Sequence, residues 1–325
     1  MARQGKENRE DGASFDVTVL VLTYHPAWEA LALTLRSVLM QRDVSLEIIV
    51  ADDGSEVNFA QETERLFQTY GFSDYQLLEH TENRGTICNY ISGLEAARGR
   101  YTKSISPGDF LTGPEVLRRW LDSTVQEGWD WSFSDAVYYR MQGENPQFLP
   151  TPPFPVYLKP YEKRDTERER WNYTVLDDAA LGATMLGRTS LKLRYARELR
   201  EIGNKYAEDY LFRLMMFDGV PCGYFPETTV FYEHGTGISS GGDPVWQKRI
   251  QEEFFRMNTL LLARPAPDAF RKRMQRALRR KTSFVGMLLV PGKLRRYVLF
   301  QVIRRKPRME TAGAAAWIAA CRGQG

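Results

Sequence analysis

The chain has 325 residues, with 44 Lys and Arg, 41 Asp and Glu, and 43% hydrophobic side chains. This length suits one large α/β domain with an appendage, or two domains. The three cysteines, Cys88, Cys222 and Cys321, have no paired spacing, which argues against a disulfide framework or a cysteine zinc site and for a reducing compartment. Residues 1–14 are polar and predict a disordered lead without a signal sequence, and no apolar run is long enough to cross a bilayer.

Basic residues are concentrated at the end of the chain. Residues 254–325 contain 17 Lys and Arg against two Asp and Glu, whereas the remainder carries a net charge of −12. A strongly basic end on an acidic body predicts contact with phosphate groups, either on a membrane surface or on nucleic acid.

The first third of the chain alternates predicted strands and helices. Residues 15–24 are an almost continuous run of apolar and β-branched side chains, which is typical of a buried parallel strand. A helical pattern follows, and the alternation then continues with helices at 28–40, 59–70 and 86–98 and strands at 46–50, 75–79 and 102–106. The order βαβαβαβ predicts a doubly wound sheet.

The rest of the chain carries a weaker version of this pattern. We predict a helix at 113–127, a strand at 129–140, a long Pro-rich loop at 145–160, a helix at 206–217 and a strand at 230–240 that leads into a Gly/Ser loop. Small residues at Gly182, Ala183, Thr184 and Gly187 mark a place where a backbone can approach a ligand. Beyond Asp243 the pattern becomes helical and basic.

Asp109 follows the strand at 102–106 through the turn Pro107-Gly108. Pro presets φ for such a turn and Gly tolerates the next position, so Asp109 is presented at the carboxyl end of the strand. Ligands bind at that edge of open α/β sheets, and a carboxylate there can hold a divalent cation against phosphates. The alternative is an ordinary surface Asp in a turn.

Polar groups also end the first two strands, as Thr23-Tyr24-His25 and as Asp52-Asp53-Gly54-Ser55. The two Asp carboxylates can accept hydrogen bonds from a base or a ribose, and Tyr24 can stack on a base. The alternative role for the Asp pair is capping of the helix that follows. A dinucleotide site is disfavoured, because no G-x-G-x-x-G follows the first strand.

Five segments together resemble the family 2 glycosyltransferases in order and spacing, over roughly residues 16–234. They are VTVLVLTYH, LTLRSVLMQ, LEIIVADDGS, ENRGTICNYISGLEAARGRYTKSISPGDFL and YAEDYLFRLM. The resemblance implies a GT-A fold, which is a Rossmann-like mixed sheet flanked by helices. It also implies a nucleotide-sugar donor, usually a UDP-sugar, a divalent cation (Mn²⁺ or Mg²⁺) and inversion at the anomeric carbon.

The resemblance assigns nucleotide-binding roles residue by residue. Thr23 and Tyr24 match positions beside the base, and Asp53, the second Asp of its pair, matches the residue that bonds the uracil. Asn83, Arg84 and Gly85 match the segment that closes over the base and ribose.

The segment Ser106-Pro107-Gly108-Asp109 stands where the family has an Asp-x-Asp-Asp type motif. Here Ser106 and Gly108 replace acidic positions, and Asp109 matches the position that meets the metal. A cation held by one carboxylate, the donor diphosphate and water remains reasonable, because Mg²⁺ is often bound in this way.

Glu208 and Asp209 match the family's Glu-Asp pair, in which the Asp is the general base. An inverting transfer needs one carboxylate to accept the proton of the attacking hydroxyl, while the leaving UDP needs its charge stabilised. A helix-start role for the pair is the alternative. His234 is similar to a late His that some members place on the diphosphate or metal, and imidazole is a suitable ligand for Mn²⁺; a surface-loop His is the alternative.

We therefore predict a disordered lead at 1–14, a GT-A domain at 15–243 and a basic helical extension at 244–325. The extension fits either an amphipathic helix on an anionic membrane or an appendage packed on the catalytic domain, whereas nucleic-acid binding is disfavoured. The predicted enzyme is cytoplasmic, peripheral on the inner membrane face if the first alternative holds, and transfers a sugar to a glycan or lipid-linked acceptor in polysaccharide biosynthesis. The other hypotheses are a non-catalytic nucleotide-sugar-binding member and a membrane-associated scaffold.

Overall fold

The computed structural model describes residues 12–142, 145–151, 153–235, 243–281, 290–292 and 314–323. The predicted lead at 1–14 and the predicted loop after residue 235 lie mostly outside these ranges. No helix within the described ranges is both long enough and apolar enough to cross a membrane.

The predicted alternation in the first third is present, and it builds a parallel sheet. β1 is parallel to both β2 and β4, and β2 is parallel to β3. β1 and β2 are buried along most or all of their length, as their unbroken apolar runs require. The elements are β1 (Phe15–Thr23), α1 (Trp28–Leu39), β2 (Leu46–Asp52), α2 (Ala60–Thr69), β3 (Tyr75–Glu79), α3 (Thr86–Ala96) and β4 (Gly99–Ile105).

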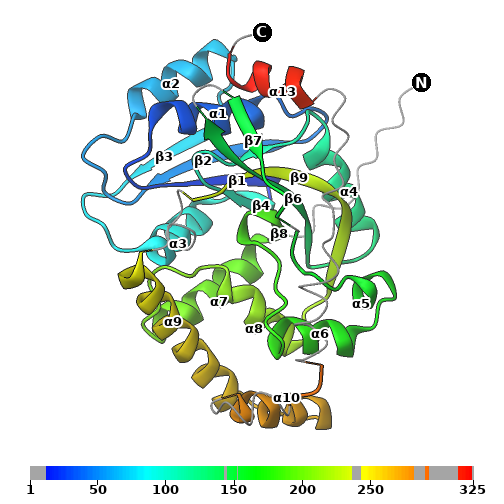
Figure 1. The fold of residues 1–325 in the computed structure, drawn as a ribbon. Helices are drawn as coiled ribbons and strands as arrows, with labels where there is room; N and C mark the ends of the chain where they lie inside the picture. The colour runs from blue at the N-terminus through cyan, green and yellow to red at the C-terminus, as the bar shows by residue number, and fades with distance from the viewer. Residues whose placement is uncertain are drawn as a thin grey trace.

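The second half adds mostly antiparallel strands to the same sheet (Figure 1). Among the described residues the order is β3-β2-β1-β4-β8-β6-β9-β5, with β7 paired to β6. The elements are β5 (Phe110–Leu111), α4 (Val116–Gln126), β6 (Trp131–Gln142), β7 (Asn145–Phe148), α5 (Lys159–Glu162), α6 (Thr166–Thr174), η1 (Gly182–Thr184), β8 (Met185–Arg188), α7 (Thr189–Glu201), α8 (Tyr210–Asp218), β9 (Cys222–Glu233), α9 (Pro244–Ala263), α10 (Ala269–Arg280) and α13 (Ala314–Cys321).

Helices cover both faces of the sheet, as Figure 1 shows. Val19 and Val21 of β1 pack with α1, α2 and α4, whereas Leu20 and Leu22 pack with α3, α7 and α8. Successive side chains of a strand point to opposite faces, so one apolar strand contributes to both cores. The predicted fold class, a mixed sheet between helical layers, is thereby confirmed.

The strand order indicates the edge of the sheet at which a ligand would bind. The chain runs from β1 outward through β2 to β3, and then returns to the other side of β1 as β4. The connection therefore reverses direction beside β1, and ligands of such sheets bind outside the carboxyl ends of the strands at that reversal. Thr23 ends β1 and Ser106 follows β4, so both lie at this edge.

The helices after residue 243 pack on the main domain. Met257 and Leu261 of α9 and Met274 and Leu278 of α10 are buried in the same core as α7 and α8. α9 and α10 are therefore packed on the main domain, as the appendage alternative predicts. The basic segment at 293–306 lies outside the described residues. α13 also contacts the main domain, because Trp317 donates its indole N–H to the Leu111 carbonyl at 2.7 Å.

Two predicted elements differ from the structure in extent. The loop at 145–160 contains β7, which pairs with β6 because its backbone can extend that antiparallel hairpin. The helix predicted at 206–217 begins at Tyr210, so Glu208 and Asp209 lie in the turn before α8. α6 and α7 were not predicted, because charged residues interrupt their apolar faces.

One buried hydroxyl of α1 organises the turn that follows β4. Thr34 is fully buried, and its Oγ1 accepts from the Gly108 amide at 3.1 Å and donates to the Asp109 carbonyl at 2.6 Å. Thr63 of α2 is also buried, but no hydrogen bond reaches its hydroxyl within the described part of the chain.

We expect Thr34→Val to lower the free energy of unfolding by about 1–3 kcal/mol, because it leaves two buried backbone groups without that partner. Thr63→Val is the matched control and should be neutral or stabilising, because its hydroxyl makes no such bond. Urea unfolding of both variants measures the difference. Equal losses of stability in the two variants would contradict a role for Thr34 in holding the turn.

Candidate active site

The predicted turn after β4 is present and fixes Asp109. The Asp109 amide donates to the Ser106 carbonyl at 3.0 Å, and Gly108 has a φ of 95°, which suits glycine after Pro107 in a type II turn. Asp109 is 5% exposed, and its Oδ1 accepts from the Glu233 amide at 2.9 Å. The turn therefore directs the Asp109 carboxylate toward the end of β9.

A second carboxylate, that of Glu233 at the end of β9, packs against the same turn. Phe110 of β5 pairs with Phe231 of β9, so the residues before Phe110 face the end of β9. A Cβ atom at Gly108 would collide with Glu233 Oε2, so this carboxylate packs directly on the glycine. The sequence pattern did not single out Glu233, because an antiparallel pairing between segments far apart in the chain brings it here.

Asp109 interacts with a buried cation, Lys103 of β4. Burial lowers the pKa of Lys103 to about 7, against the opposing effect of Asp109. Burial raises the pKa of Asp109 to about 7, while the Glu233 amide and the Lys103 charge act in the other direction. A carboxylate withdrawn from water in this way gains stability from any further cation beside it. Lys103 was not predicted, because it interrupts an otherwise apolar strand without a recognisable motif.

Asp53 binds the segment that the resemblance assigns to the base and ribose. Its carboxylate accepts from the Arg84 amide at 3.0 Å and from the Gly85 amide at 2.9 Å. The Gly85 amide also lies 3.1 Å from Asn83 Oδ1, while the Arg84 side chain is exposed and reaches the His80 ring at 2.9 Å. The end of β2 and the loop before α3 therefore form one unit.

Asp52 has a local role beside this unit. Its carboxylate accepts from the Thr23 hydroxyl at 2.8 Å and from the Ser55 amide at 2.7 Å, which closes the turn after β2. The capping alternative does not apply to α2, which begins at Ala60. Tyr24 is 51% exposed, with its ring centroid 4.2 Å from that of His25, so an aromatic face is available beside the turn.

Glu208 and Asp209 lie together in the turn before α8, and both are partly exposed. A Cβ at Gly182 would lie 3.2 Å from Asp209 Cβ, so the small-residue segment packs on Asp209 as its composition suggested. Withdrawal from water raises the pKa of Asp209, and Glu253 of α9 adds to this effect. Withdrawal from water and the Asp209 charge raise the pKa of Glu208, against the buried cation Lys192.

Buried charges connect the acidic pair with the turn at Asp109. Within the described ranges no hydrogen bond joins Asp109 to Glu208 or Asp209. The charge of Asp109 raises the pKa of Lys103. The charge of Lys103 lowers the pKa of Lys192, and the charge of Glu208 raises it. Lys192 of α7 is 1% exposed and donates to the Thr102 carbonyl at 2.9 Å, which fixes it against β4.

His234 follows Glu233 and is partly exposed. Its Nδ1 lies 3.1 Å from Arg140 Nη2, and its carbonyl accepts from Arg140 Nε at 3.3 Å. Across the described residues no group of three or more His, Cys, Asp or Glu side chains is arranged to hold a metal ion by itself. A cation at this edge would therefore need oxygen atoms from a bound substrate or from water.

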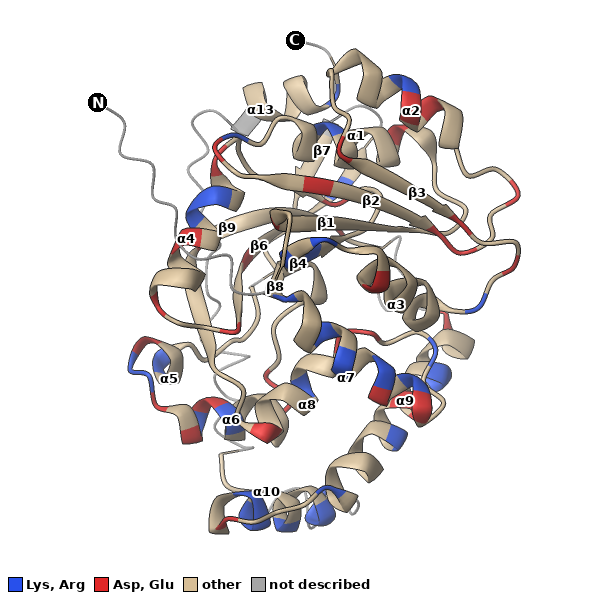
Figure 2. Ribbon diagram, turned by 180° about the vertical axis from the view of Figure 1, so that it is seen from behind, with Lys and Arg blue, Asp and Glu red and all other residues tan. Residues whose placement is uncertain are grey.

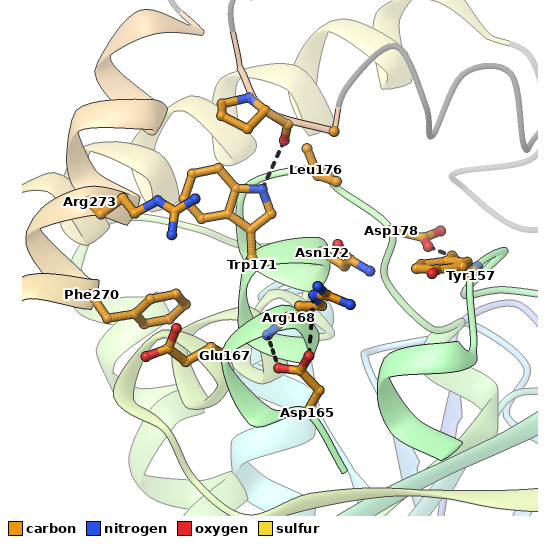
Figure 3. Close-up of a pocket in the computed structure, with 12 residues that line it drawn as sticks. Tyr157, Asp165, Glu167, Arg168, Trp171, Asn172, Leu176, Asp178, Phe270 and Arg273 are labelled. Atoms are coloured by element: carbon orange, nitrogen blue, oxygen red, sulfur yellow. Dashed lines mark hydrogen bonds and ion pairs between the residues drawn. The ribbon is translucent and has the colours of Figure 1, made fainter. Parts of the chain in front are cut away.

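A separate cavity of about 510 Å³ lies between α6 and α10. Figure 3 shows Trp171 at its wall, with the indole N–H bonded to the Pro291 carbonyl at 3.0 Å and Arg273 beside the ring. None of the described residues that line it belongs to the sites predicted from the sequence.

Gly85 lies where the base-side loop meets the backbone before the acidic pair. Its φ is 92°, and a Cβ there would lie 2.8 Å from the Lys205 carbonyl oxygen. Gly71 also has a positive φ, of 62°, but nothing lies within 4 Å of the Cβ position. Gly85 also has a ψ of 153°, a conformation essentially restricted to glycine, so it differs from Gly71 both in backbone strain and in the collision.

We expect Gly85→Ala to lower the free energy of unfolding by clearly more than Gly71→Ala, whose cost is about 1–2 kcal/mol from φ alone. The excess reflects the glycine-only conformation of Gly85 together with displacement of the Lys205 backbone or of the loop that binds Asp53. Urea unfolding measures both variants. If Gly85→Ala lost no more free energy of unfolding than Gly71→Ala, the loop would be shown to accommodate the added methyl group at little cost.

The comparisons with known proteins agree with this geometry. A family model described as Glycosyl transferase family 2 matches residues 18–103. The fold is similar to that of S. aureus TarS residues 1–349 in complex with UDP, at 15% identity and a TM-score of 0.51, over 94% of this chain and 78% of that chain. The complex of the same TarS fragment with UDP-GlcNAc has a TM-score of 0.54 at 15% identity, over 94% and 89% of the two chains. No curated protein matches in sequence.

At this identity the solved structures establish the fold, and the family model establishes the sequence relationship in the segment that contains Thr23, Asp52, Asp53 and Gly85. The GT-A fold predicted from the sequence is confirmed, and over residues 18–103 the sequence is similar to the family 2 glycosyltransferases.

Proposed function

We propose that this protein is an inverting glycosyltransferase that transfers a sugar from a nucleotide-sugar, in particular a UDP-sugar, to a hydroxyl group. The observation that carries the proposal is the joining of Asp53 to residues 84 and 85 beside the exposed Tyr24 ring. This unit lies at the reversal of strand order, where ligands of such sheets bind. The family match supports this donor class, as does the similarity in fold to TarS, whose structures include complexes with UDP and UDP-GlcNAc.

The nucleoside end of the donor is proposed to occupy the Asp53 unit. Tyr24 would stack on the base, and Thr23 and Asp52 would hold the turn that positions it. The diphosphate would then extend toward the turn formed by Ser106, Pro107, Gly108 and Asp109, because the two segments follow β2 and β4, the parallel strands on either side of β1. Arg84 would close over the ribose from an exposed position.

The residues at this turn fit a hard divalent cation, Mn²⁺ or Mg²⁺. No hydrogen bond from the described residues reaches Asp109 Oδ2, although the side chain is 95% withdrawn from solvent, and the Glu233 carboxylate lies on the same turn. Asp109 and Glu233 would hold the cation together with oxygen atoms of the donor diphosphate and of water, whereas His234, which contacts Arg140, does not complete a three-residue ligand group with them among the described residues. When bound, the cation would offset the charge that develops on the leaving diphosphate.

Asp209 is the proposed general base. It would accept the proton of the acceptor hydroxyl as that oxygen attacks the anomeric carbon from the face opposite the diphosphate. Burial and Glu253 raise the pKa of Asp209, which brings this carboxyl closer to the pH at which a base works best. Glu208 would act as a supporting group beside Asp209. The charge of Lys192 lowers the pKa of Glu208 and so favours its ionised form.

The acceptor is proposed to be a glycan or a lipid-linked glycan at the cytoplasmic face of a membrane, in polysaccharide biosynthesis. α10 has no acidic residue, and Figure 2 shows its Lys and Arg positions at one end of the molecule. Lys272, Arg276 and Arg280 are exposed, whereas Met274 and Leu278 are buried in the protein core. Membrane contact through α10 would therefore be electrostatic, without insertion of its apolar face.

Asp209→Asn is expected to lower kcat for transfer from UDP-GlcNAc or another UDP-sugar by about 10²–10⁴-fold, while UDP binding is retained. In the wild type, the rate should rise with pH as Asp209 loses its proton, and the raised pKa moves this rise above the ordinary range of a carboxyl group. Glu201→Gln, at the exposed end of α7, is the control. Full activity in Asp209→Asn would exclude Asp209 as the base.

Removal of the cation with EDTA should weaken UDP binding to the wild type by at least about tenfold. Asp109→Asn and Glu233→Gln should each lose much of this Mn²⁺ dependence, because each removes one charged ligand. Glu227→Gln on the same strand is the matched control, since Glu227 pairs with Arg119 on the surface. Isothermal titration with UDP, with and without Mn²⁺, measures the effect, and unchanged Mn²⁺ dependence in both variants would refute this metal site.

A further inference from the structure

Glu253 of α9 is a buried carboxylate that lies outside the segment matched by the family model. It is 2% exposed, and its two oxygens accept from the amides of Lys205, Tyr206 and Ala207 at 2.8–3.1 Å. Both carboxyl oxygens face donors, so the ionised form fits here, because a protonated oxygen would point its hydrogen at an N–H. A buried anion is costly unless it is satisfied in this way.

The three amides belong to the residues that lead directly into Glu208 and Asp209. The segment is also fixed at its other side, because the Lys205 carbonyl accepts from the Ile87 amide at 2.8 Å and packs on Gly85. Asn204 extends the same contact, with its Nδ2 donating to the Glu253 carbonyl at 3.3 Å and its Oδ1 accepting from Arg256 at 3.0 Å. One segment of α9 therefore holds the link between the base-side loop and the acidic pair.

We propose that Glu253 is a positioning residue of the active site, which holds residues 205–207 so that Asp209 and Glu208 are fixed relative to the loop at Gly85. This inference rests on the proposed function for the role of Asp209, whereas the holding of residues 205–207 does not depend on it. It assigns part of the catalytic arrangement to α9, in the helical extension rather than in the predicted catalytic domain.

The charge of Glu253 has a second consequence, which a purely structural contact would lack. It raises the pKa of both Asp209 and Glu208. Other titratable groups face Glu208 and Asp209 from the elements packed around them, and these residues must be left unchanged in any test. They are Lys192 of α7, Tyr90 of α3, Tyr173 of α6 and Tyr210 of α8.

Three variants separate geometry from charge. Glu253→Gln removes the charge and turns an amide group toward one of the backbone donors. Glu253→Asp keeps the charge but is one methylene shorter, so it cannot reach all three amides. Glu252→Gln is the matched control, because Glu252 is the exposed neighbour on the same helix.

Hydrogen–deuterium exchange of the full chain is the first measurement. The amides of residues 205–207 should exchange about tenfold faster in Glu253→Gln and in Glu253→Asp than in the wild type, because their acceptor is weakened or withdrawn. Glu252→Gln should exchange like the wild type. Unchanged exchange in both Glu253 variants would overturn the inference whether or not the protein transfers sugar.

The pH profile of transfer is the second measurement. In Glu253→Gln kcat should fall about tenfold or more with little change in KM for the donor, and the rise of rate with pH should move to lower pH, because loss of a negative charge lowers the pKa of Asp209. In Glu253→Asp kcat should fall without this shift.

A wild-type kcat and an unshifted profile in Glu253→Gln, together with faster exchange, would show that the segment is held without positioning the pair, which overturns the inference. Absence of transfer by the wild type with UDP-, GDP- and dTDP-sugars would instead refute the proposed function, and the exchange result would still decide whether Glu253 holds the segment.

Discussion

Two buried hydroxyl groups, on Thr34 of α1 and Tyr139 of β6, hold the turn on which the candidate active site depends. Thr34 binds the Gly108 amide and the Asp109 carbonyl, and Tyr139 donates to the Gly108 carbonyl. The Gly108 amide also donates to the Ala30 carbonyl at 3.2 Å, so several hydrogen bonds together limit the freedom of the turn to rearrange. The parallel half of the sheet and the later strands thus meet at a fixed point, and Asp109 faces Glu233 there.

The turn and the acidic pair form one electrostatic system across the sheet. Lys103 and Lys192 are both buried, and they interact with Asp109 and Glu208 respectively. Burial shifts the pKa of each of these groups toward its neutral form, and the opposite charge beside each group offsets part of that shift. A bound diphosphate and its cation would enter a site already organised by these charges. The Glu233 carboxylate places near Gly108 an acid that the turn sequence lacks.

Local patterns predicted the parts of this molecule that depend on local physics. The apolar run of β1, the turn at Pro107-Gly108 and the helical periodicity of α1 are properties of short segments, and all three are present. Glu233 and Glu253 could not be predicted, because their importance comes from long-range pairing of β5 with β9 and from docking of α9 on the loop at 205–207. The family resemblance brought Asp53 together with Gly85, which spacing alone would not have paired.

A crystal structure with UDP and Mn²⁺, with anomalous scattering recorded for the manganese, tests the central claim most directly. The account predicts uridine beside Tyr24 and Asp53, and a manganese peak within ligand distance of Asp109 and Glu233 with the diphosphate as its other neighbour. Uridine in the cavity between α6 and α10, or a manganese peak that avoids both carboxylates, would contradict it.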